Sequence, residues 1–248
     1  MVIAVSGKGG TGKTTLAALV VRRCIKKLDK PVLAVDADPN SNLGGKLGLE
    51  AELTIGDMRE DVLRHRHDAS AGTPKQRVIE YGVQNAVAEG DGFDLVVMGR
   101  GEGPGCYCSV NNMLRTFLHG LSSGYKHIVI DNEAGMEHLS RRTDDKVDLM
   151  LVVSDSTPTG LRSAKRIAEM AEDLAVVRGR LWLIVNRVTD FEQAERCAAD
   201  YAGLDLLGCI PEDPLVQDYE LQCRSVLELP DESKAPAALD RALVRVGM

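Results

Sequence analysis

Short apolar runs alternate with longer amphipathic segments along most of this 248-residue chain. Several runs are continuously rich in Val, Ile, Leu, Ala and Met, as expected of parallel strands covered on both faces. The pattern predicts strands at residues 2–6, 31–36, 94–99, 127–131, 149–154, 181–186 and 206–210. It predicts helices near residues 14–28, 110–121, 160–176, 190–201 and 235–246. This alternation favours an α/β fold, with a doubly wound, mostly parallel sheet flanked by helices.

We expect a single domain over residues 1–248, because no internal repeat or low-complexity linker divides the chain. Residues 49–91 have the least regular pattern. We expect a helical excursion with one loop there, and the sequence indicates no function for it.

A glycine-rich segment joins the first predicted strand to the first predicted helix. Gly7, Gly12, Lys13 and Thr14 fit the pattern G-x-x-x-x-G-K-[ST] of a phosphate-binding loop. Glycine lets backbone N–H groups close round phosphate oxygens, and the helix N-terminus adds positive potential. We expect Lys13 to reach the β- and γ-phosphates and the Thr14 hydroxyl to bind Mg²⁺. The nucleotide contacts predicted from this loop are Gly9, Gly10, Thr11, Gly12, Lys13, Thr14 and Thr15.

Lys8 places a second lysine near the start of this loop. The pattern K-G-G-x-G-K-[ST]-T resembles the deviant Walker A motif of the MinD, ParA and nitrogenase iron-protein class of ATPases. The resemblance implies ATP as ligand and a nucleotide-dependent homodimer, in which Lys8 reaches across to the partner's nucleotide and neutralises charge during phosphoryl transfer. Without the resemblance, Lys8 is also compatible with a solvated surface lysine.

The second predicted strand ends in two aspartates, Asp36 and Asp38, before Pro39. This segment resembles the D-x-D-P switch I of the same class. The resemblance implies that Asp38 orients the attacking water and that Asp36 assists at the Mg²⁺ site. Asp-Pro is also an ordinary turn signal, so a turn alone is the other interpretation of Asp38.

A third acidic position, Asp131, stands at the end of the predicted strand at residues 127–131. A carboxylate at the C-terminal end of a buried strand is well placed to bind Mg²⁺ through water, although Asp131 could instead cap a helix. Asp131 matches the Walker B aspartate of the class. Gly135 matches its switch II glycine, whose N–H contacts the γ-phosphate.

The last two predicted strands end in segments that could hold the base. In the class that this chain resembles, an asparagine amide pairs with adenine and the segment after the last strand closes over it. Asn186 and Pro211 stand at these positions, and an amide both donates and accepts hydrogen bonds. An asparagine at a strand end is as often a turn residue, so Asn186 depends on the order of the other motifs.

Two thiols, Cys106 and Cys108, lie in a glycine-rich segment after the third predicted strand. Two such thiols can bind one soft metal ion, but a tetrahedral thiolate site needs four. A two-fold dimer with this loop at its interface would supply four. Two ordinary loop thiols are the alternative. We expect the other cysteines to be small buried apolar side chains: Cys24, Cys197, Cys209 and Cys223.

Residues 103–115 and 130–141 make the resemblance closer. Together with the loop at residues 7–15, they are similar to the CooC-type accessory ATPases, which assist nickel insertion into carbon monoxide dehydrogenase, with relatives that serve acetyl-CoA synthase. The resemblance implies a metallochaperone ATPase with ATP and Mg²⁺ as cofactors. It also implies Ni²⁺ or Zn²⁺ bridging the dimer through Cys106 and Cys108, and a nickel enzyme as client.

Composition limits the classes of partner that we expect for this chain. The net charge is −7 without a block of Lys or Arg, so we expect no nucleic-acid partner. No apolar run is long enough to span a bilayer, and we expect no membrane partner. Six cysteines without an apparent export signal favour reduced thiols and a cytoplasmic location.

Two other function classes share these nucleotide motifs. A positioning ATPase of the partition or cell-division type should carry a basic amphipathic C-terminal helix, but residues 235–246 contain only two arginines. An electron-donating iron protein with a bridging [4Fe–4S] cluster should carry a cysteine just after switch II, but residues 131–145 contain none. Metal handling is therefore the function that we expect.

Overall fold

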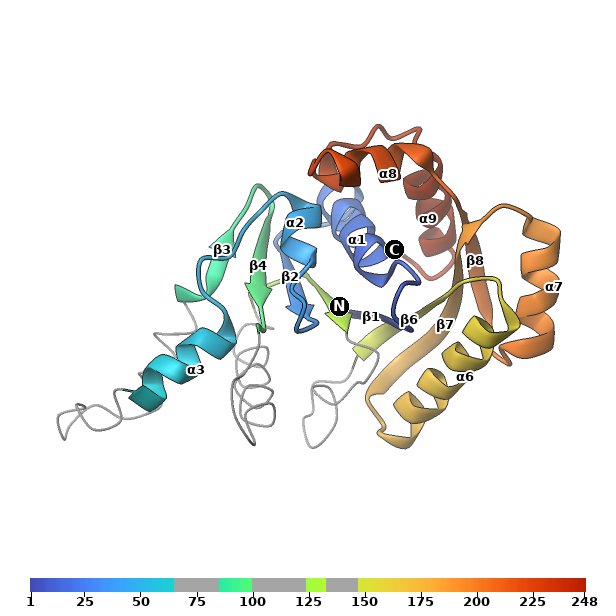
Figure 1. Ribbon diagram of the computed structural model, residues 1–248, viewed down its shortest axis with the longest axis horizontal. Coiled ribbons are helices and arrows are strands. Elements are labelled where there is room, and N and C mark those ends of the chain that lie inside the picture. The colour runs from blue at the N-terminus through green and yellow to red at the C-terminus, as the bar shows by residue number, and fades with distance from the viewer. Residues whose placement is uncertain (65–84, 100–123, 133–146) are drawn as a thin grey trace.

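One sheet with helices on both faces forms the framework of the computed structural model, which describes residues 1–64, 85–99, 124–132 and 147–248 (Figure 1). Within these residues the sheet has eight strands in the order β3-β4-β2-β5-β1-β6-β7-β8. The β3–β4 pair is antiparallel and the others are parallel. The predicted α/β class, with a mostly parallel sheet, is confirmed.

The described elements follow the chain in the expected alternation. The strands are β1 (Val2–Gly7), β2 (Val32–Ala37), β3 (Val87–Glu89), β4 (Phe93–Val97), β5 (His127–Asn132), β6 (Val147–Ser154), β7 (Val177–Val188) and β8 (Leu206–Pro211). The helices are α1 (Lys13–Lys27), α2 (Leu43–Leu47), α3 (Ile55–Arg64), α6 (Pro158–Asp173), α7 (Phe191–Tyr201), α8 (Pro214–Leu221), the short 3₁₀ helix η2 (Val226–Glu228) and α9 (Lys234–Val244).

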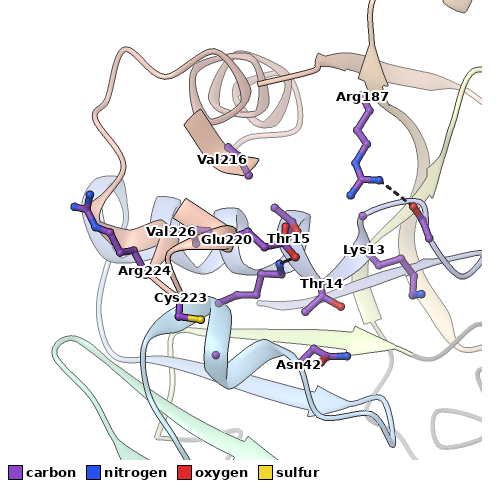
Figure 2. Close-up of a pocket in the computed structure, with 14 residues that line it drawn as sticks. Lys13, Thr14, Thr15, Asn42, Arg187, Val216, Glu220, Cys223, Arg224 and Val226 are labelled. Atoms are coloured by element: carbon purple, nitrogen blue, oxygen red, sulfur yellow. Dashed lines mark hydrogen bonds and ion pairs between the residues drawn. The ribbon is translucent and has the colours of Figure 1, made fainter. Parts of the chain in front are cut away.

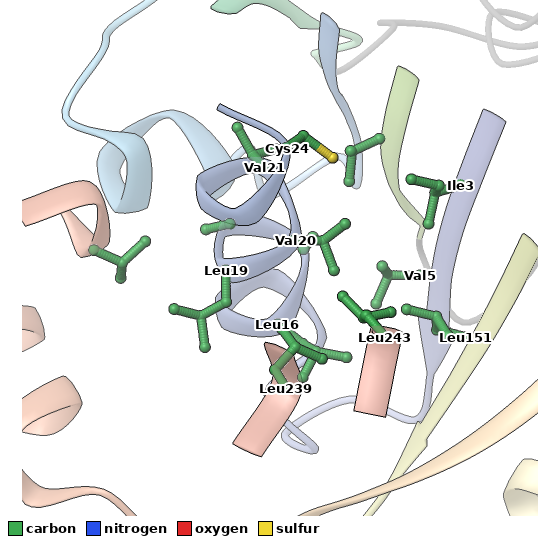
Figure 3. Close-up of a cluster of buried hydrophobic side chains, with 14 of the residues drawn as sticks. Ile3, Val5, Leu16, Leu19, Val20, Val21, Cys24, Leu151, Leu239 and Leu243 are labelled. Atoms are coloured by element: carbon green, nitrogen blue, oxygen red, sulfur yellow. The ribbon is translucent and has the colours of Figure 1, made fainter. Parts of the chain in front are cut away.

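Alternate residues of each central strand enter different hydrophobic clusters. On β1, Ile3 and Val5 pack in the cluster that also holds α1, α2, α8 and α9, whereas Ala4 packs in the cluster of α6 and α7. On β2, Leu33 and Val35 pack with α3 in a third cluster. Successive side chains of a strand point to opposite faces, so the sheet is buried on both sides. Figure 3 shows α1 packed over this sheet, with residues of β1 and α9 around it.

The sheet order changes direction at β1. The chain passes from β1 through α1 to β2 on one side, whereas β6 pairs with β1 on the other. In open α/β sheets, ligands bind beyond the carboxyl ends of the strands at such a switch point. The loop after β1 lies there, so the topology places it where a ligand is expected.

Several elements differ from the sequence expectations. β7 starts at Val177 rather than at residue 181. Arg178 and Arg180, in the part of the strand that was not expected, are exposed. The edge strand β3 and the helices α2 and α8 were not expected as separate elements. The helix predicted at residues 110–121 lies outside the described residues. No described helix is both long enough and apolar enough to span a bilayer.

Candidate nucleotide-binding site

The loop between β1 and α1 has the backbone that its glycines permit. Gly10 (φ 84°) and Gly12 (φ 87°) take left-handed conformations, and Gly12 caps the N-terminus of α1. Thr11 closes the turn, because its hydroxyl donates to the Lys8 carbonyl at 2.8 Å. A Cβ atom on Gly12 would lie 2.5 Å from Asn186 Nδ2, so the loop also needs glycine here for space.

Two residues at the end of β7 hold this loop. The Asn186 amide donates from Nδ2 to the Thr11 carbonyl at 2.9 Å, in a buried position. Arg187 donates from Nη1 to the Gly10 carbonyl at 3.3 Å, and its own φ is 56°. The distant strand β7 therefore fixes the shape of the phosphate-binding loop. The predicted pairing of Asn186 with adenine stays a prediction.

Two aspartates lie side by side beneath the loop. Asp36 on β2 and Asp131 on β5 are register partners, and both are almost completely buried. Their strand neighbours Ala34 and Val129, two residues away, pack in the cluster of α1, so both carboxylates face α1. Asp36 accepts hydrogen bonds from the Leu43 amide at 2.8 Å and the Asp38 amide at 3.2 Å. Among the described residues, neither carboxylate oxygen of Asp131 has a hydrogen-bond partner.

Burial governs the protonation of this pair. It raises the pKa of Asp36 to about 7, against the Leu43 hydrogen bond that lowers it, and the charge of Asp131 adds to the rise. Burial also raises the pKa of Asp131 to about 6, while the Thr14 hydroxyl, which lies near the carboxylate without completing a hydrogen bond to it, and the Lys13 ammonium group oppose the rise. A divalent cation would favour the ionised form of both carboxylates. The two buried acids, with orphaned oxygens on Asp131, fit the Mg²⁺ site predicted from Thr14, Asp36 and Asp131.

No dedicated cage for a metal is formed by the described residues, which contain no group of three or more His, Cys, Asp or Glu side chains able to hold one. Magnesium commonly keeps several water ligands and uses one or two carboxylates with the phosphates of a nucleotide. A pair of aspartates and one hydroxyl is therefore sufficient for the role that we assign to Mg²⁺.

Asp38 begins the segment that leads from β2 to α2. Its Oδ1 accepts from both the backbone and the side-chain nitrogen of Asn40, each at 2.9 Å, and the side chain is partly exposed. The amide of Leu43, the first residue of α2, binds Asp36. Asp38 therefore forms a local turn, as the alternative interpretation expected, and its water-orienting role stays a prediction.

A pocket of about 460 Å³ opens beside the loop. Figure 2 shows Lys13 and Thr14 with Arg187 on one side of it and Cys223 and Arg224 on another. Its lining residues come from the loop and α1, from the segment around α2, from the end of β7, and from α8 and the residues after it. They are Gly10, Gly12, Lys13, Thr14, Thr15, Asn42, Gly45, Lys46, Arg187, Val216, Glu220, Cys223, Arg224 and Val226.

A smaller pocket adjoins this one and contains both positions predicted for the base. It is lined by Asn186, Pro211, Glu212 and Asp213, and by residues of α1 and α8. Thr15, Arg187, Val216 and Glu220 line both pockets. The pockets that hold the predicted phosphate and base residues thus share part of their walls.

The remaining predicted site residues have mixed outcomes. Lys8 and Gly9 are exposed, and Lys8 is therefore accessible to a partner. Gly135, Cys106 and Cys108 lie outside the described residues. Cys223, which we expected to be buried, is exposed and lines the larger pocket, because it follows the last turn of α8 with φ 53°.

Four charged pocket residues were not singled out from the sequence, namely Arg187, Lys46, Glu220 and Arg224. These residues are far from the phosphate-binding loop in the sequence and share no motif with it. The packing of α2 and α8 brings Lys46, Glu220 and Arg224 to the pocket. For Arg187, its place directly after Asn186 at a strand end was an available signal.

The comparisons with known proteins agree with this geometry. The family model described as the CobQ/CobB/MinD/ParA nucleotide binding domain matches residues 2–226. The chain therefore belongs to this family of nucleotide-binding domains.

Relatives within the family differ in what their names state. An uncharacterized ATP-binding protein of Methanocaldococcus jannaschii is 42% identical over 237 residues, which cover 94% of this chain and 93% of the relative. The carbon monoxide dehydrogenase accessory protein CooC of Rhodospirillum rubrum is 32% identical, with 100% and 98% covered. The cell division ATPase MinD of Pyrococcus furiosus has a solved structure that matches with a TM-score of 0.72 at 24% identity, covering 99% of this chain and 98% of that chain. This last likeness shows the fold.

Proposed function

We propose that this chain is a dimeric ATPase that carries a metal ion, Ni²⁺ or Zn²⁺, and assists nickel insertion into a client such as carbon monoxide dehydrogenase or acetyl-CoA synthase. The observation that carries the proposal is the Cys106/Cys108 pair on a chain that aligns with CooC over its full length. The pair, with its two-fold mate, would supply the four thiolates of a tetrahedral site.

The start of the cysteine-containing segment supports a link between metal and nucleotide. β4 leads into this segment, and the Met98 amide donates to the Asp36 carbonyl at 2.8 Å. Gly99 then turns with φ 69°. The chain thus leaves the sheet beside a carboxylate of the proposed Mg²⁺ site. A change at the proposed Mg²⁺ site would therefore act where the chain enters the segment that carries Cys106 and Cys108.

The proposed reaction is hydrolysis of ATP to ADP and phosphate. Water attacks the γ-phosphorus, the bond from that phosphorus to the β–γ bridging oxygen breaks, and the water's proton passes to the phosphate or to Asp38. Lys13 offsets charge on the β- and γ-phosphates, and the partner's copy of Lys8 offsets the charge that develops on transfer. Mg²⁺, held through Thr14, Asp36 and Asp131, would supply further positive charge.

Turnover of two variants tests the ATPase part. Lys13→Ala should lose ATP hydrolysis, because the main charge partner of the phosphates is gone. Asp38→Ala should still bind ATP but lose turnover. Normal hydrolysis by Asp38→Ala would show that another group orients the water.

Metal content tests the metal part. The purified dimer should bind about one ion through four thiolates, and Cys106→Ser/Cys108→Ser should bind none while retaining ATP binding. Cys223→Ser, which removes an exposed thiol outside the proposed metal loop, is the matched control and should bind the ion normally. One ion per monomer, or full binding by the double variant, would refute the shared site.

A positioning ATPase is the alternative function, because MinD of Synechocystis is 25% identical over 86% of this chain. Such a protein binds a surface through an apolar or basic face. In α9 most apolar residues, including Leu239 and Leu243, are already buried in the core, and Val244 is the large apolar side chain left exposed. ATP-dependent binding to lipid vesicles or DNA, with no metal bound, would favour this alternative.

A further inference from the structure

An ion pair joins two walls of the nucleotide pocket. Lys46 Nζ on α2 lies 2.5 Å from Glu220 Oε1 on α8, and both residues line the pocket. The Lys46 side chain is 15% exposed, so most of it lies within the protein. The pair therefore connects the segment after Asp36 with the helix that follows the last strand.

This pair lines the same pocket as the predicted phosphate-binding residues Lys13 and Thr14. Lys13 and Thr14 line only the larger pocket, and Asn186 and Pro211 line only the smaller one, whereas Glu220 lines both. Thr15 also lines both, and Figure 2 shows it with Glu220 in the middle of the site. A nucleotide whose phosphates lie at Lys13 and Thr14 shares this pocket with the Lys46–Glu220 pair.

The charges around the pocket make this contact consequential. Among the described residues that line the larger pocket, Glu220 is the single acid, and the cations are Lys13, Lys46, Arg187 and Arg224. Arg224 is already paired with Glu228 at 2.9 Å, and Arg187 donates to the Gly10 carbonyl. A polyphosphate is repelled by the Glu220 carboxylate and attracted by the Lys46 ammonium group.

We propose that the Lys46–Glu220 pair is an exchangeable ion pair, in which Glu220 holds Lys46 until the phosphates of the nucleotide take Lys46 over. The inference rests on the proposed seat of the nucleotide at residues 7–15. Lys46 then acts as a further phosphate-binding residue, and Glu220 lowers nucleotide affinity by competing for it.

The exchange also reaches the magnesium site. The Leu43 amide at the start of α2 donates to Asp36, and the Ser225 hydroxyl donates to the Lys46 carbonyl at 3.4 Å near its end. Because α2 is only five residues long, a shift of this helix with Lys46 would change both contacts. Nucleotide binding would therefore reposition α2 against a proposed Mg²⁺ ligand.

Affinities for a non-hydrolysable ATP analogue and for adenosine test the exchange by calorimetry. Glu220→Gln should bind the analogue about twofold to fivefold more tightly, since a partly exposed ion pair no longer opposes binding. Adenosine affinity should not change, because it carries no phosphate. Lys46→Met should weaken analogue binding, and the loss should be about twofold to fivefold larger in the Glu220→Gln background than in the unmodified chain. Matched controls are Asp218→Asn on α8 and Lys27→Met on α1, which line neither pocket.

Four outcomes would overturn the exchange or its basis. If Lys46→Met has no effect in the Glu220→Gln background, Lys46 only neutralises Glu220 and does not contact phosphate. An equal gain for adenosine would show a steric barrier rather than exchange. If Lys13→Ala binds the analogue normally, the proposed seat is wrong. If Lys13→Ala loses binding while the Lys46 and Glu220 variants match their controls, the exchange alone fails.

Discussion

At the scale of single residues, the site depends on an arrangement that is costly without a ligand. Asp131 is 1% exposed and its carboxylate oxygens lack hydrogen bonds among the described residues. Burial raises its pKa to about 6, so the folded protein holds this proton more tightly than the unfolded chain. The charge of Asp131 therefore destabilises the nucleotide-free fold, increasingly as pH rises from the unfolded pKa near 4 to the folded one.

Replacing this carboxylate should stabilise the nucleotide-free protein. At pH 7.5, Asp131→Asn should raise the free energy of unfolding by about 1–3 kcal/mol, because the amide has nearly the shape of the carboxylate but carries no charge. At pH 4 the gain should nearly vanish, because the native carboxyl is then protonated in the fold. Urea unfolding followed by the fluorescence of Trp182, the single tryptophan, measures both values. Equal destabilisation at both pH values would contradict the assigned cause.

Glycines of the loop offer a second test, with a matched pair. Gly12→Ala should destabilise the nucleotide-free protein by about 1–3 kcal/mol, because φ is 87° and the new Cβ would meet Asn186 Nδ2 at 2.5 Å. Gly9→Ala should change stability by less than about 0.5 kcal/mol, since nothing lies within 4 Å of its Cβ position. Thermal unfolding compares them, and similar losses in both variants would contradict the loop geometry.

Sequence patterns identified only part of the site. The loop, Asp36 and Asp131 were predictable because each lies at the C-terminal end of a buried strand, and parallel strands bring these ends to one edge. The hydrogen bond from Asn186 to the loop and the Lys46–Glu220 pair were not predictable. These contacts join residues far apart in the sequence, and their side chains are brought together only by packing.

At the scale of elements, α9 belongs to the core although it ends the chain. It packs against β8 and α1, and Leu239 and Leu243 are fully buried. Two buried arginines of α1 strengthen this end of the molecule, because Arg22 donates to the Leu229 carbonyl and Arg23 to that of Met248. The helix that bears the phosphate loop is thus tied directly to the C-terminal segment.

Truncating a core side chain of α9 should show this dependence. Leu239→Ala should lower the free energy of unfolding by about 2–5 kcal/mol, because it leaves a cavity beside α1. Val244→Ala, at a site that is 63% exposed, should cost less than about 0.5 kcal/mol. Chemical denaturation compares the two variants. A small effect of Leu239→Ala would mean that α9 is only loosely attached.

Elements were predictable where periodicity was strong. The central strands were found because continuous apolar runs mark strands covered on both faces, as in β2 and β6. The strand β3 was missed because it has three residues at the sheet edge and is only partly buried. The helix α8 was missed because just Val216 and Tyr219 of its eight residues are buried.

At the scale of the whole molecule, the proposed reaction requires a dimer. Lys8 is exposed in the single chain, at the edge where the nucleotide is proposed to bind. A lysine acting on the partner's nucleotide makes each site composite, so that one subunit supplies Lys8 and the other supplies Lys13 and Asp38.

Mixing two inactive variants should therefore recover activity. Lys8→Ala and Asp38→Ala should each hydrolyse ATP poorly. In a mixed dimer, the Lys8→Ala subunit keeps its own Asp38 and receives Lys8 from its partner, so one of two sites is complete. Random exchange should restore about a quarter of the normal rate. Recovery of no activity, or sedimentation as a monomer in every nucleotide state, would contradict action across the interface.

Metal affinity measured with and without a non-hydrolysable ATP analogue tests whether the proposed metal site depends on the nucleotide. If ATP closes the dimer and brings Cys106 and Cys108 of both subunits together, the analogue should tighten binding of Ni²⁺ or Zn²⁺. By linkage, the metal should tighten binding of the analogue by the same factor. Cys106→Ser/Cys108→Ser should abolish both effects. A metal affinity that is the same with and without the analogue would contradict the account.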